Sequence, residues 1–380
     1  MRRSKAKVFL VKTVTLLLLF VPITQSLFSA YMYYTLSPDW EAIWLTWNGD
    51  PARSIVINWR WDMAGYAYVL YWNSTYRGIV NISAGKLNHV LISGLSPSTT
   101  YSYVIGYYEQ GEMVNWSSVH TFHTPSAMGA IRAIILSDTH APGYGMFDKV
   151  LRAVSSEGRG DFIMHCGDMV DRSFPQFWAS FFTGFSGILS ELPIMPSIGN
   201  HEIHYGDPTL FYRFFELPNN EKWYFYRVGN ALFISLYVAD THNFTFPREE
   251  YEILIEAMNL AKEKNLWTIV YFHVPPIRVM PIVRYPEIAN KLREVFTTIK
   301  PDLILTGHYH VYARTEFLGS KLVLMGASGG FPNQVIFKDI FEKYSFKPGY
   351  GILEVGEDKL CFKYVSIDGK IIDEFEILRT

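Results

Sequence analysis

Residues 131–140 read IRAIILSDTH, an apolar run that ends in Asp138-Thr139-His140. The run predicts a buried strand over 131–136, followed by a polar loop. Apolar runs of the same kind recur farther along, at 162–166, 267–272 and 303–306. Segments with helical periodicity lie between them, at 146–156, 247–265 and 286–299. Strands that alternate with helices are typical of an α/β layer fold, which therefore begins at this stretch.

The clearest of these helices is the segment 247–265. Pro247 suits its first turn, Glu249 and Glu250 suit the positive end of its dipole, and two lysines close it. Its apolar residues are spaced so that one face points inward, and the residues expected on that face are Tyr251, Leu254, Ile255 and Met258.

The chain before residue 131 has a different sequence pattern. Short β-rich runs separated by turns extend from about Leu36 to Pro125. After the turn at Pro97, Tyr101, Tyr103 and Ile105 alternate with other residues, so one face of that strand is expected to be buried. A tyrosine just after such a turn resembles the tyrosine corner of β-sandwiches, and the region resembles a fibronectin type III-like module. We therefore expect an all-β sandwich at 36–125 and a second domain at 128–380.

Composition excludes some partners. The chain has 34 Lys+Arg against 36 Asp+Glu, a formal net charge of −2, so nothing in the overall balance calls for nucleic acid. Its two cysteines, Cys166 and Cys361, are expected to be small core residues and not a disulfide.

The first 30 residues have the layout of a signal peptide or an N-terminal membrane anchor. Five basic residues precede an apolar stretch from Val14 to Ile23, and no charged residue occurs between Lys12 and Asp39. A run of that length suits either a cleaved leader or an uncleaved span. Both interpretations predict a folded part that is secreted or on the extracellular face of the membrane, with membrane contact only through the anchor.

Five polar blocks stand out, each where an apolar strand ends and a loop begins. They are Asp138-Thr139-His140, Gly167-Asp168, Gly199-Asn200-His201-Glu202, His273 and Gly307-His308-Tyr309-His310. Loops at the carboxyl ends of strands are where open α/β sheets place their sites, so we expect the five blocks to converge. A Gly-Asn turn before a histidine is by itself an ordinary way to leave a strand, and the other four blocks are what favour a functional site.

The blocks supply two Asp, one Asn and five His, which suit two metal ions such as Fe, Mn or Zn. Asp138/His140 and His308/His310 are spaced so that both members of a pair face the same way from extended backbone. Two divalent ions outweigh two aspartates and a bridging hydroxide by roughly one positive charge, so the site should attract an anion. The expected ligand is a small phosphorylated substrate.

The order of the blocks resembles the motif set of the calcineurin-like metallophosphoesterase superfamily, over about Ile131 to the C-terminus. Within it the chain looks most like the purple acid phosphatase branch, because of the fibronectin-like domain in front, the junction Phe122–Pro125 and the extended block Gly307–Arg314. The resemblance implies a four-layer α/β/β/α catalytic domain.

The resemblance also implies roles for the residues. One metal ion would take Asp138, His140, Asp168 and His310. The second would take Asp168, Asn200, His273 and His308, with Asp168 as the bridge. His201 would bind no metal and would protonate the leaving alkoxide, oriented by Glu202. A histidine suits that work because it can carry a proton near neutral pH.

One position departs from the branch. Purple acid phosphatases place a tyrosine ligand three residues after the bridging Asp, and this chain has Asp171 there, followed by Arg172. We therefore expect no purple ferric centre and a site closer to the wider superfamily, with Asp171 supporting the ligands. Arg172, His204 and His242 are further candidates for support or substrate contact.

The sequence thus predicts an exported dinuclear-metal phosphoesterase that hydrolyses phosphate monoesters by in-line attack of a metal-bound hydroxide, with His201 as general acid. A phosphodiesterase or nucleotidase using the same site is one alternative. A cell-surface binding protein on a metallophosphoesterase scaffold is another, although the full set of expected site residues argues against it.

Overall fold

The computed structural model describes residues 40–158, 160–203, 208–239, 245–280, 286–332 and 337–379. The predicted leader at 1–30, His204 and His242 lie outside these residues. Within them, no helix is long and apolar enough to cross a membrane.

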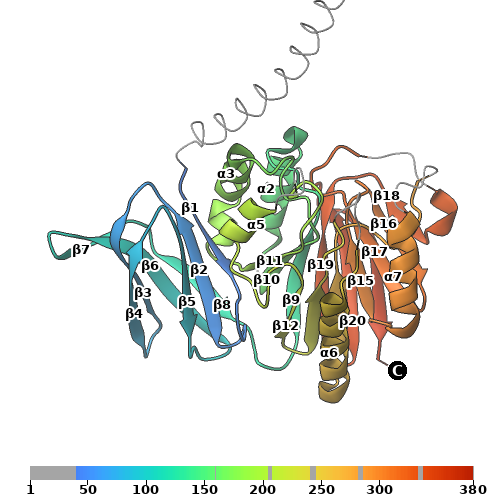
Figure 1. The fold of residues 1–380 in the computed structure, drawn as a ribbon, viewed down its shortest axis with the longest axis horizontal. Helices are drawn as coiled ribbons and strands as arrows, with labels where there is room; N and C mark the ends of the chain where they lie inside the picture. The colour runs from blue at the N-terminus through green and yellow to red at the C-terminus, as the bar shows by residue number, and fades with distance from the viewer. Residues whose placement is uncertain are drawn as a thin grey trace, which may run out of the picture.

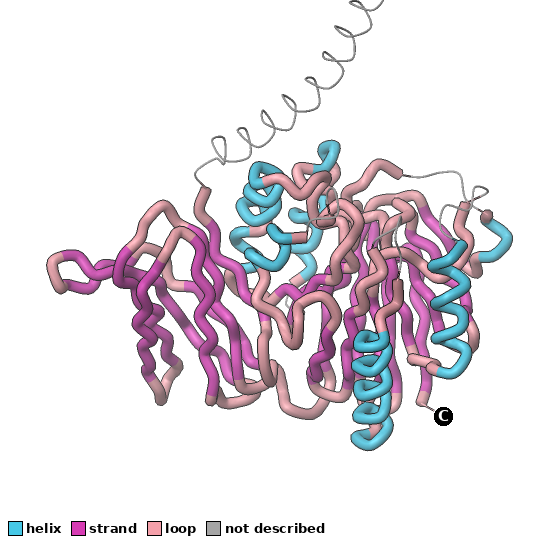
Figure 2. Tube along the Cα trace, viewed as in Figure 1, coloured by secondary structure: helices cyan, strands magenta, loops and turns pink. Residues whose placement is uncertain are grey.

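The first domain is built from antiparallel strands (Figures 1 and 2). One sheet contains β1 (Ala42–Thr46), β2 (Ser54–Arg60) and β5 (Leu87–Ser93). The other contains β3 (Gly65–Trp72), β4 (Arg77–Ala84), β6 (Thr99–Glu109), β7 (Glu112–Asn115) and β8 (His120–Thr124). On β6, Tyr101, Tyr103 and Ile105 are buried as predicted, and the hydroxyl of Tyr101 accepts a hydrogen bond from the backbone N–H of Ser96 at 3.0 Å. This bond closes a tyrosine corner.

The second domain contains two sheets. In the first, the parallel strands β11 (Ile194–Pro196), β10 (Phe162–His165) and β9 (Ile131–Leu136) continue into the antiparallel β19 (Gly349–Val355), β20 (Lys359–Ser366) and β21 (Ile371–Leu378). The second sheet runs in the order β12 (Tyr224–Val228), β13 (Ala231–Ser235), β14 (Trp267–Tyr271), β15 (Leu303–Thr306), β17 (Ser320–Met325), β16 (Tyr312–Phe317) and β18 (Lys343–Ser345). Its middle strands β13, β14, β15 and β17 are parallel.

Successive side chains on these strands point to opposite faces of the sheet, so they pack into two different cores. Phe233 belongs to the core shared with the other sheet, whereas Leu232 and Ile234 belong to a core shared with α6 (Arg248–Lys264) and α7 (Pro286–Thr298). On the other side, α2 (Phe147–Glu157) packs against β19 of the first sheet. Both faces of each sheet are therefore covered, which gives the expected α/β/β/α order.

The inward face of α6 differs from the sequence prediction. Leu254 is buried and Ile255 and Met258 are half-buried, but Tyr251 is 37% exposed. The fully buried stripe is Glu250, Leu254, Ala257 and Ala261. Small alanines let this face lie close to the sheet, so the helix turns them inward and leaves the bulky tyrosine outside.

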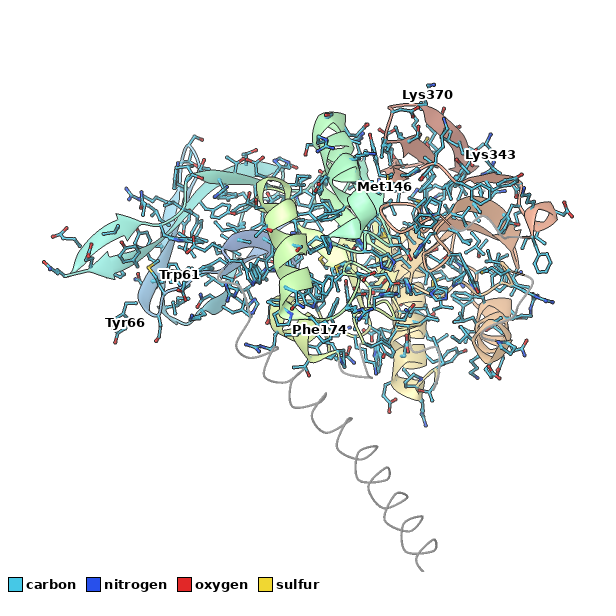
Figure 3. All side chains as sticks on the ribbon, turned by 90° about the horizontal axis from the view of Figure 1, so that it is seen from above. Trp61, Tyr66, Met146, Phe174, Lys343 and Lys370 are labelled. Atoms are coloured by element: carbon cyan, nitrogen blue, oxygen red, sulfur yellow. The ribbon has the colours of Figure 1, made fainter. Side chains whose placement is uncertain are left out.

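The two domains share one continuous core. Strand β1 packs against α3 (Pro175–Gly184) and the short α4 (Ser186–Leu189). The ring of Trp44 lies 4.2 Å from that of Phe182 on α3, and its Nε1–H donates to the carbonyl of Phe214 at the end of α5 (Thr209–Phe214) at 2.8 Å. Figure 3, in which Phe174 marks the start of α3, shows side chains filling the space between the domains. The sandwich is therefore packed onto the second domain and not joined to it only by a linker.

Candidate metal centre

The five blocks meet at one end of the two sheets. The loops after β9, β10 and β11 carry Asp138 and His140, Asp168, and Asn200 with His201. The loops after β14 and β15 of the other sheet carry His273, and His308 with His310. The strands within each set are parallel neighbours, so their carboxyl ends lie at the same edge. Convergence was expected from the sequence, and the site is assembled by both sheets.

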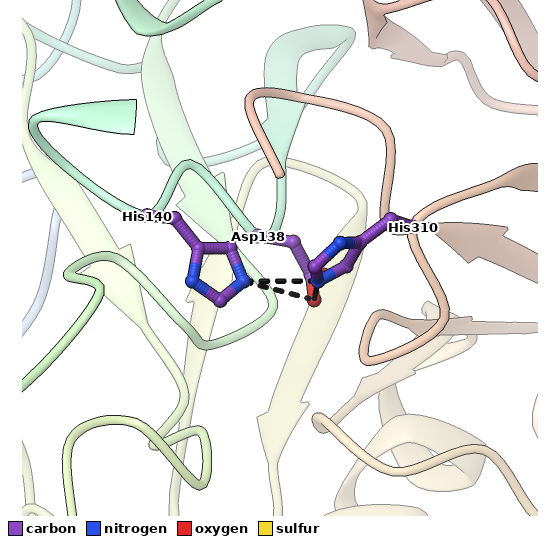
Figure 4. Close-up of side chains that lie close together, drawn as sticks. All are labelled: Asp138, His140 and His310. Atoms are coloured by element: carbon purple, nitrogen blue, oxygen red, sulfur yellow. Dashed lines mark hydrogen bonds and ion pairs between the residues drawn. The ribbon is translucent and has the colours of Figure 1, made fainter. Parts of the chain in front are cut away.

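One cluster contains Asp138, His140 and His310 (Figure 4). The Nε2 atoms of His140 and His310 are 3.0 Å apart. The Oδ1 atom of Asp138 lies 3.9 Å from the first of these nitrogens and 3.5 Å from the second. Asp138 is fully buried and His140 almost fully, whereas the side chain of His310 is 24% exposed, so solvent reaches the cluster from the His310 side.

A second cluster contains Asp168, His273 and His308, with Asn200 beside them. The Nε2 atom of His273 is 3.0 Å from Asp168 Oδ2 and 3.0 Å from Asn200 Oδ1. Nδ1 of His308 lies 2.9 Å from the same Asn200 oxygen. The residues expected to hold the second metal ion are therefore brought together.

Asp168 lies between the clusters. Its Oδ2 atom is 3.7 Å from Nε2 of His140, in the first cluster, and 3.0 Å from Nε2 of His273, in the second. Burial opposes the charge on this carboxylate, but the imidazoles of His273 and His201 hold the pKa of Asp168 well below its usual value. An ionised carboxylate between two donor clusters has the position of a bridging ligand.

The donor atoms fit positive ions. Nδ1 of His310 is 2.8 Å from the carbonyl of Phe331, and Nδ1 of His273 is 2.9 Å from that of Cys166. A carbonyl only accepts, so each Nδ1 carries the hydrogen and each Nε2 faces the cluster. Burial opposes charge on His273, yet the adjacent Asp168 raises its pKa to about 9. The cluster therefore demands positive charge at that point, and a metal ion would replace the proton there.

The backbone of these loops is unusual. Asp138, His140, Asp168 and His308 have φ angles of 53°, 46°, 56° and 70°. The left-handed region is unfavourable for such residues by about 1–2 kcal/mol each. These angles contradict the extended backbone expected from the sequence at Asp138, His140 and His308. Backbone bonds help to hold the strained form, because the N–H of His308 donates to the Asp138 carboxylate at 3.0 Å and the N–H of His201 donates to Asp168 Oδ1 at 2.9 Å.

Glu202 acts on the backbone and not on His201, contrary to the expected orienting role. Its buried carboxylate accepts the N–H groups of Gly199, Asp168 and Met169 at 2.7–2.8 Å. It thus ties the Asn200 loop to the Asp168 loop, and none of these described bonds reaches the His201 ring. Burial and the nearby Asp168 raise the pKa of Glu202 to about 7.

Asp171 is close to two histidines. Its carbonyl accepts a hydrogen bond from Nδ1 of His201 at 2.5 Å, and its Oδ1 lies 3.6 Å from Nδ1 of His140. The carboxylate therefore faces the side of the His140 ring away from the cluster, which suits support and not ligation. Arg172 is exposed.

The side chain of His201 is 34% exposed, and its Nε2 lies 3.8 Å from Asp168 Oδ2. A ring nitrogen of His201 also lies close to donor atoms of His140 and Asp168. These three residues form a group that could hold a metal ion. Geometry alone therefore allows His201 to act either as a ligand or as an acid above the site.

Sequence reasoning missed one supporting pair. Nε2 of buried His165 lies 3.0 Å from Thr139 Oγ1, which in turn donates to the carbonyl of Met169 at 3.0 Å. This chain joins the Asp138 loop to the Asp168 loop. The available signal was a histidine inside an otherwise apolar strand, and burial lowers its pKa to about 3, so it is neutral.

Both domains of the chain match known families. Residues 131–312 match the family described as calcineurin-like phosphoesterase, and residues 40–124 match the purple acid phosphatase N-terminal domain. Purple acid phosphatase 15 of Arabidopsis thaliana is 24% identical over 350 residues, covering 74% of this chain. The chain spans only 63% of that relative. Probable inactive purple acid phosphatase 1 of the same plant is 22% identical over 91% of this chain and 68% of its own length.

Solved structures show the same fold. A purple acid phosphatase from yellow lupin seeds superposes with a TM-score of 0.78 at 18% identity, covering 90% of this chain and 75% of its own. PhoD gives a TM-score of 0.68 at 13% identity, covering 90% and 88%. The chain therefore consists of a purple acid phosphatase N-terminal domain followed by a calcineurin-like phosphoesterase domain, and purple acid phosphatases are among its relatives.

Proposed function

We propose that this chain is an exported, metal-dependent phosphoesterase that hydrolyses phosphate monoesters. The observation that carries the proposal is the place of Asp168, whose carboxylate lies within 3.7 Å of Nε2 of His140 and 3.0 Å of Nε2 of His273. One ionised oxygen shared by two sets of donors suits a pair of metal ions, and Fe, Mn and Zn accept such mixed ligands. The export signal expected at 1–30 supports the location.

Bound metal ions would supply a water molecule activated for in-line attack and would offset the negative charge of the phosphate. The residues of the chain arrange that site. Asp138, His140 and His310 would hold one ion, and Asn200, His273 and His308 the other, with Asp168 shared. Glu202 keeps the Asp168 and Asn200 loops in register through their N–H groups.

We assign the acid to His201. Its Nδ1–H is donated to the Asp171 carbonyl, so Nε2 is the atom that faces the site and carries the second proton. A protonated Nε2 would hold a phosphate oxygen and then pass its proton to the leaving alkoxide. Partial exposure of the ring lets the substrate reach it and lets solvent restore the proton.

The test uses protein purified without added ions. Its metal content is measured first, the metal is then removed with a chelator, and Zn, Mn or Fe is returned separately. Turnover of p-nitrophenyl phosphate is compared with that of bis-p-nitrophenyl phosphate under each condition. Metal-dependent turnover that favours the monoester is expected, whereas much faster turnover of the diester would select the phosphodiesterase alternative.

A binding protein on the same scaffold is the second candidate, and it is favoured by relatives named as inactive. In this chain, however, the expected donor side chains are present and their donor atoms converge. Stoichiometric metal without turnover of any phosphate ester would select this alternative.

A further inference from the structure

The segment at Gly330 and Phe331 lies directly against the first cluster. The carbonyl of Phe331 accepts the Nδ1–H of His310 at 2.8 Å, and the N–H of Gly330 donates to the carbonyl of Asp138 at 2.8 Å. A Cβ atom at Gly330 would lie 2.6 Å from Nδ1 of His310, so only glycine lets the backbone approach the ring this closely. Main-chain contacts therefore fix the position of Phe331 beside a predicted metal ligand.

The side chain of Phe331 has few contacts of its own. It is 74% exposed, and no other phenylalanine in the described part of the chain is in the exposed class. Only Cα and Cβ separate this exposed ring from the carbonyl that holds His310, so the ring begins close to the first cluster. An aromatic surface kept in water beside a polar site is suited to contact with a ligand.

We propose that Phe331 is a specificity-determining residue that favours phosphate esters whose leaving group is a flat aromatic ring. This inference rests on the proposed function. With the phosphate among the clusters, the leaving group must extend outward, and Phe331 offers it a face or an edge for ring contact. Aromatic pairs add an advantage of about 2- to 10-fold over the same area of aliphatic contact.

The test compares two phosphonates that cannot be hydrolysed. Phenylphosphonate and cyclohexylphosphonate have rings of equal size, but only the first is flat. Their binding to the metal-loaded full chain is measured by calorimetry. We expect phenylphosphonate to bind about 2- to 10-fold more tightly, Phe331→Ala and Phe331→Leu to remove this preference, and Phe331→Tyr to retain it. Phe331→Leu separates ring contact from apolar area.

The matched control is Tyr66→Ala, which removes an aromatic side chain that is 76% exposed at the outer part of the sandwich (Figure 3). It should leave the preference unchanged. Metal content should also be unchanged in the Phe331 variants, because His310 is held by a main-chain carbonyl. Equal weakening of both phosphonates in Phe331→Ala, or a preference that survives it, would overturn the inference.

A third arm separates this inference from two other outcomes. If Phe331→Ala affects adenosine monophosphate relative to ribose 5-phosphate but not the phosphonate pair, the ring contacts a distant base and the assignment to aryl leaving groups is wrong. If no phosphate ester is hydrolysed, the proposed function fails, but the phosphonate pair still reports on Phe331.

Discussion

Asp171 supports His201 and His140 through two different groups. Its main-chain carbonyl accepts from Nδ1 of His201 at 2.5 Å, while its carboxylate lies 3.6 Å from Nδ1 of His140. Substitution of the side chain can therefore disturb one histidine and leave the bond to the other intact. This separation makes the two parts of the site accessible to different experiments.

Asp171→Asn should weaken metal binding by about 10- to 100-fold, because the carboxylate that steadies His140 is lost. At saturating metal, kcat should fall much less, since the carbonyl that holds His201 remains. Metal affinity is measured by competition with a chelator. Asp148→Asn, an exposed aspartate on α2, is the control. Unchanged affinity in Asp171→Asn would show that the carboxylate gives His140 no support.

His201→Ala should retain bound metal and lower kcat by about 10²–10⁴-fold, because the leaving alkoxide loses its proton donor. The loss should be larger for an alkyl phosphate than for p-nitrophenyl phosphate, whose leaving group needs a proton less. Kinetics and metal content are measured on the same preparations. Loss of metal from this variant would instead make His201 a ligand, which its distance of 3.8 Å from Asp168 permits.

Asp168→Asn should lose most of both metal ions, whereas Asp138→Asn should lose mainly one. The reason is position: Asp168 lies near both clusters, and Asp138 belongs to the group with His140 and His310. Metal-to-protein ratios after dialysis provide the measurement. Equal losses in the two variants would contradict a bridging role for Asp168.

Glu250→Gln should stabilise the protein at neutral and alkaline pH. Burial raises the pKa of Glu250 to about 8, above the ordinary value of 4.5. The folded state therefore binds a proton that the unfolded state has released, and stability falls as pH rises from 4.5 toward 8. At pH 7 the effect is about 3 kcal/mol.

Thermal unfolding of Glu250→Gln is followed from pH 5 to pH 8.5. The difference in Tm from the unsubstituted chain should grow with pH, and comparing the two proteins cancels effects of the metal site. Glu249→Gln, its exposed neighbour in the same helical turn, should show no such trend. A constant difference across this range would mean that Glu250 does not titrate as predicted.

Sequence patterns predicted four strands and three helices of the second domain, and each of their ends lies within one residue of the predicted position. Ile131–Leu136 and Leu303–Thr306 form strands with the predicted bounds, because continuous apolar runs suit strands buried on both faces. The convergence of the blocks also followed from the sequence, since parallel neighbouring strands end at one edge.

Local backbone geometry could not be predicted in the same way. Contacts with segments far away in the chain hold Asp138 and His140 in left-handed conformations. The alternating pattern of an extended strand gives no sign of such contacts. The role of Glu202 was also missed, because its partners are backbone N–H groups near Asp168 that carry no side-chain signature. On α6 the apolar pattern named Tyr251 as inward, but close packing favoured Ala257 and Ala261.

The contact of Trp44 with Phe182 and Phe214 has a consequence for how this chain can be divided. Helix α3 follows the loop that carries Asp168, and α5 follows the loop that carries Asn200, so the sandwich packs against the helices that follow two loops of the candidate metal centre. A fragment beginning near residue 128 would leave a cluster of bare aromatic rings in water and two ligand loops without their backing. The sandwich is therefore a structural support for the second domain, and a second domain separated from it would need another apolar surface in its place.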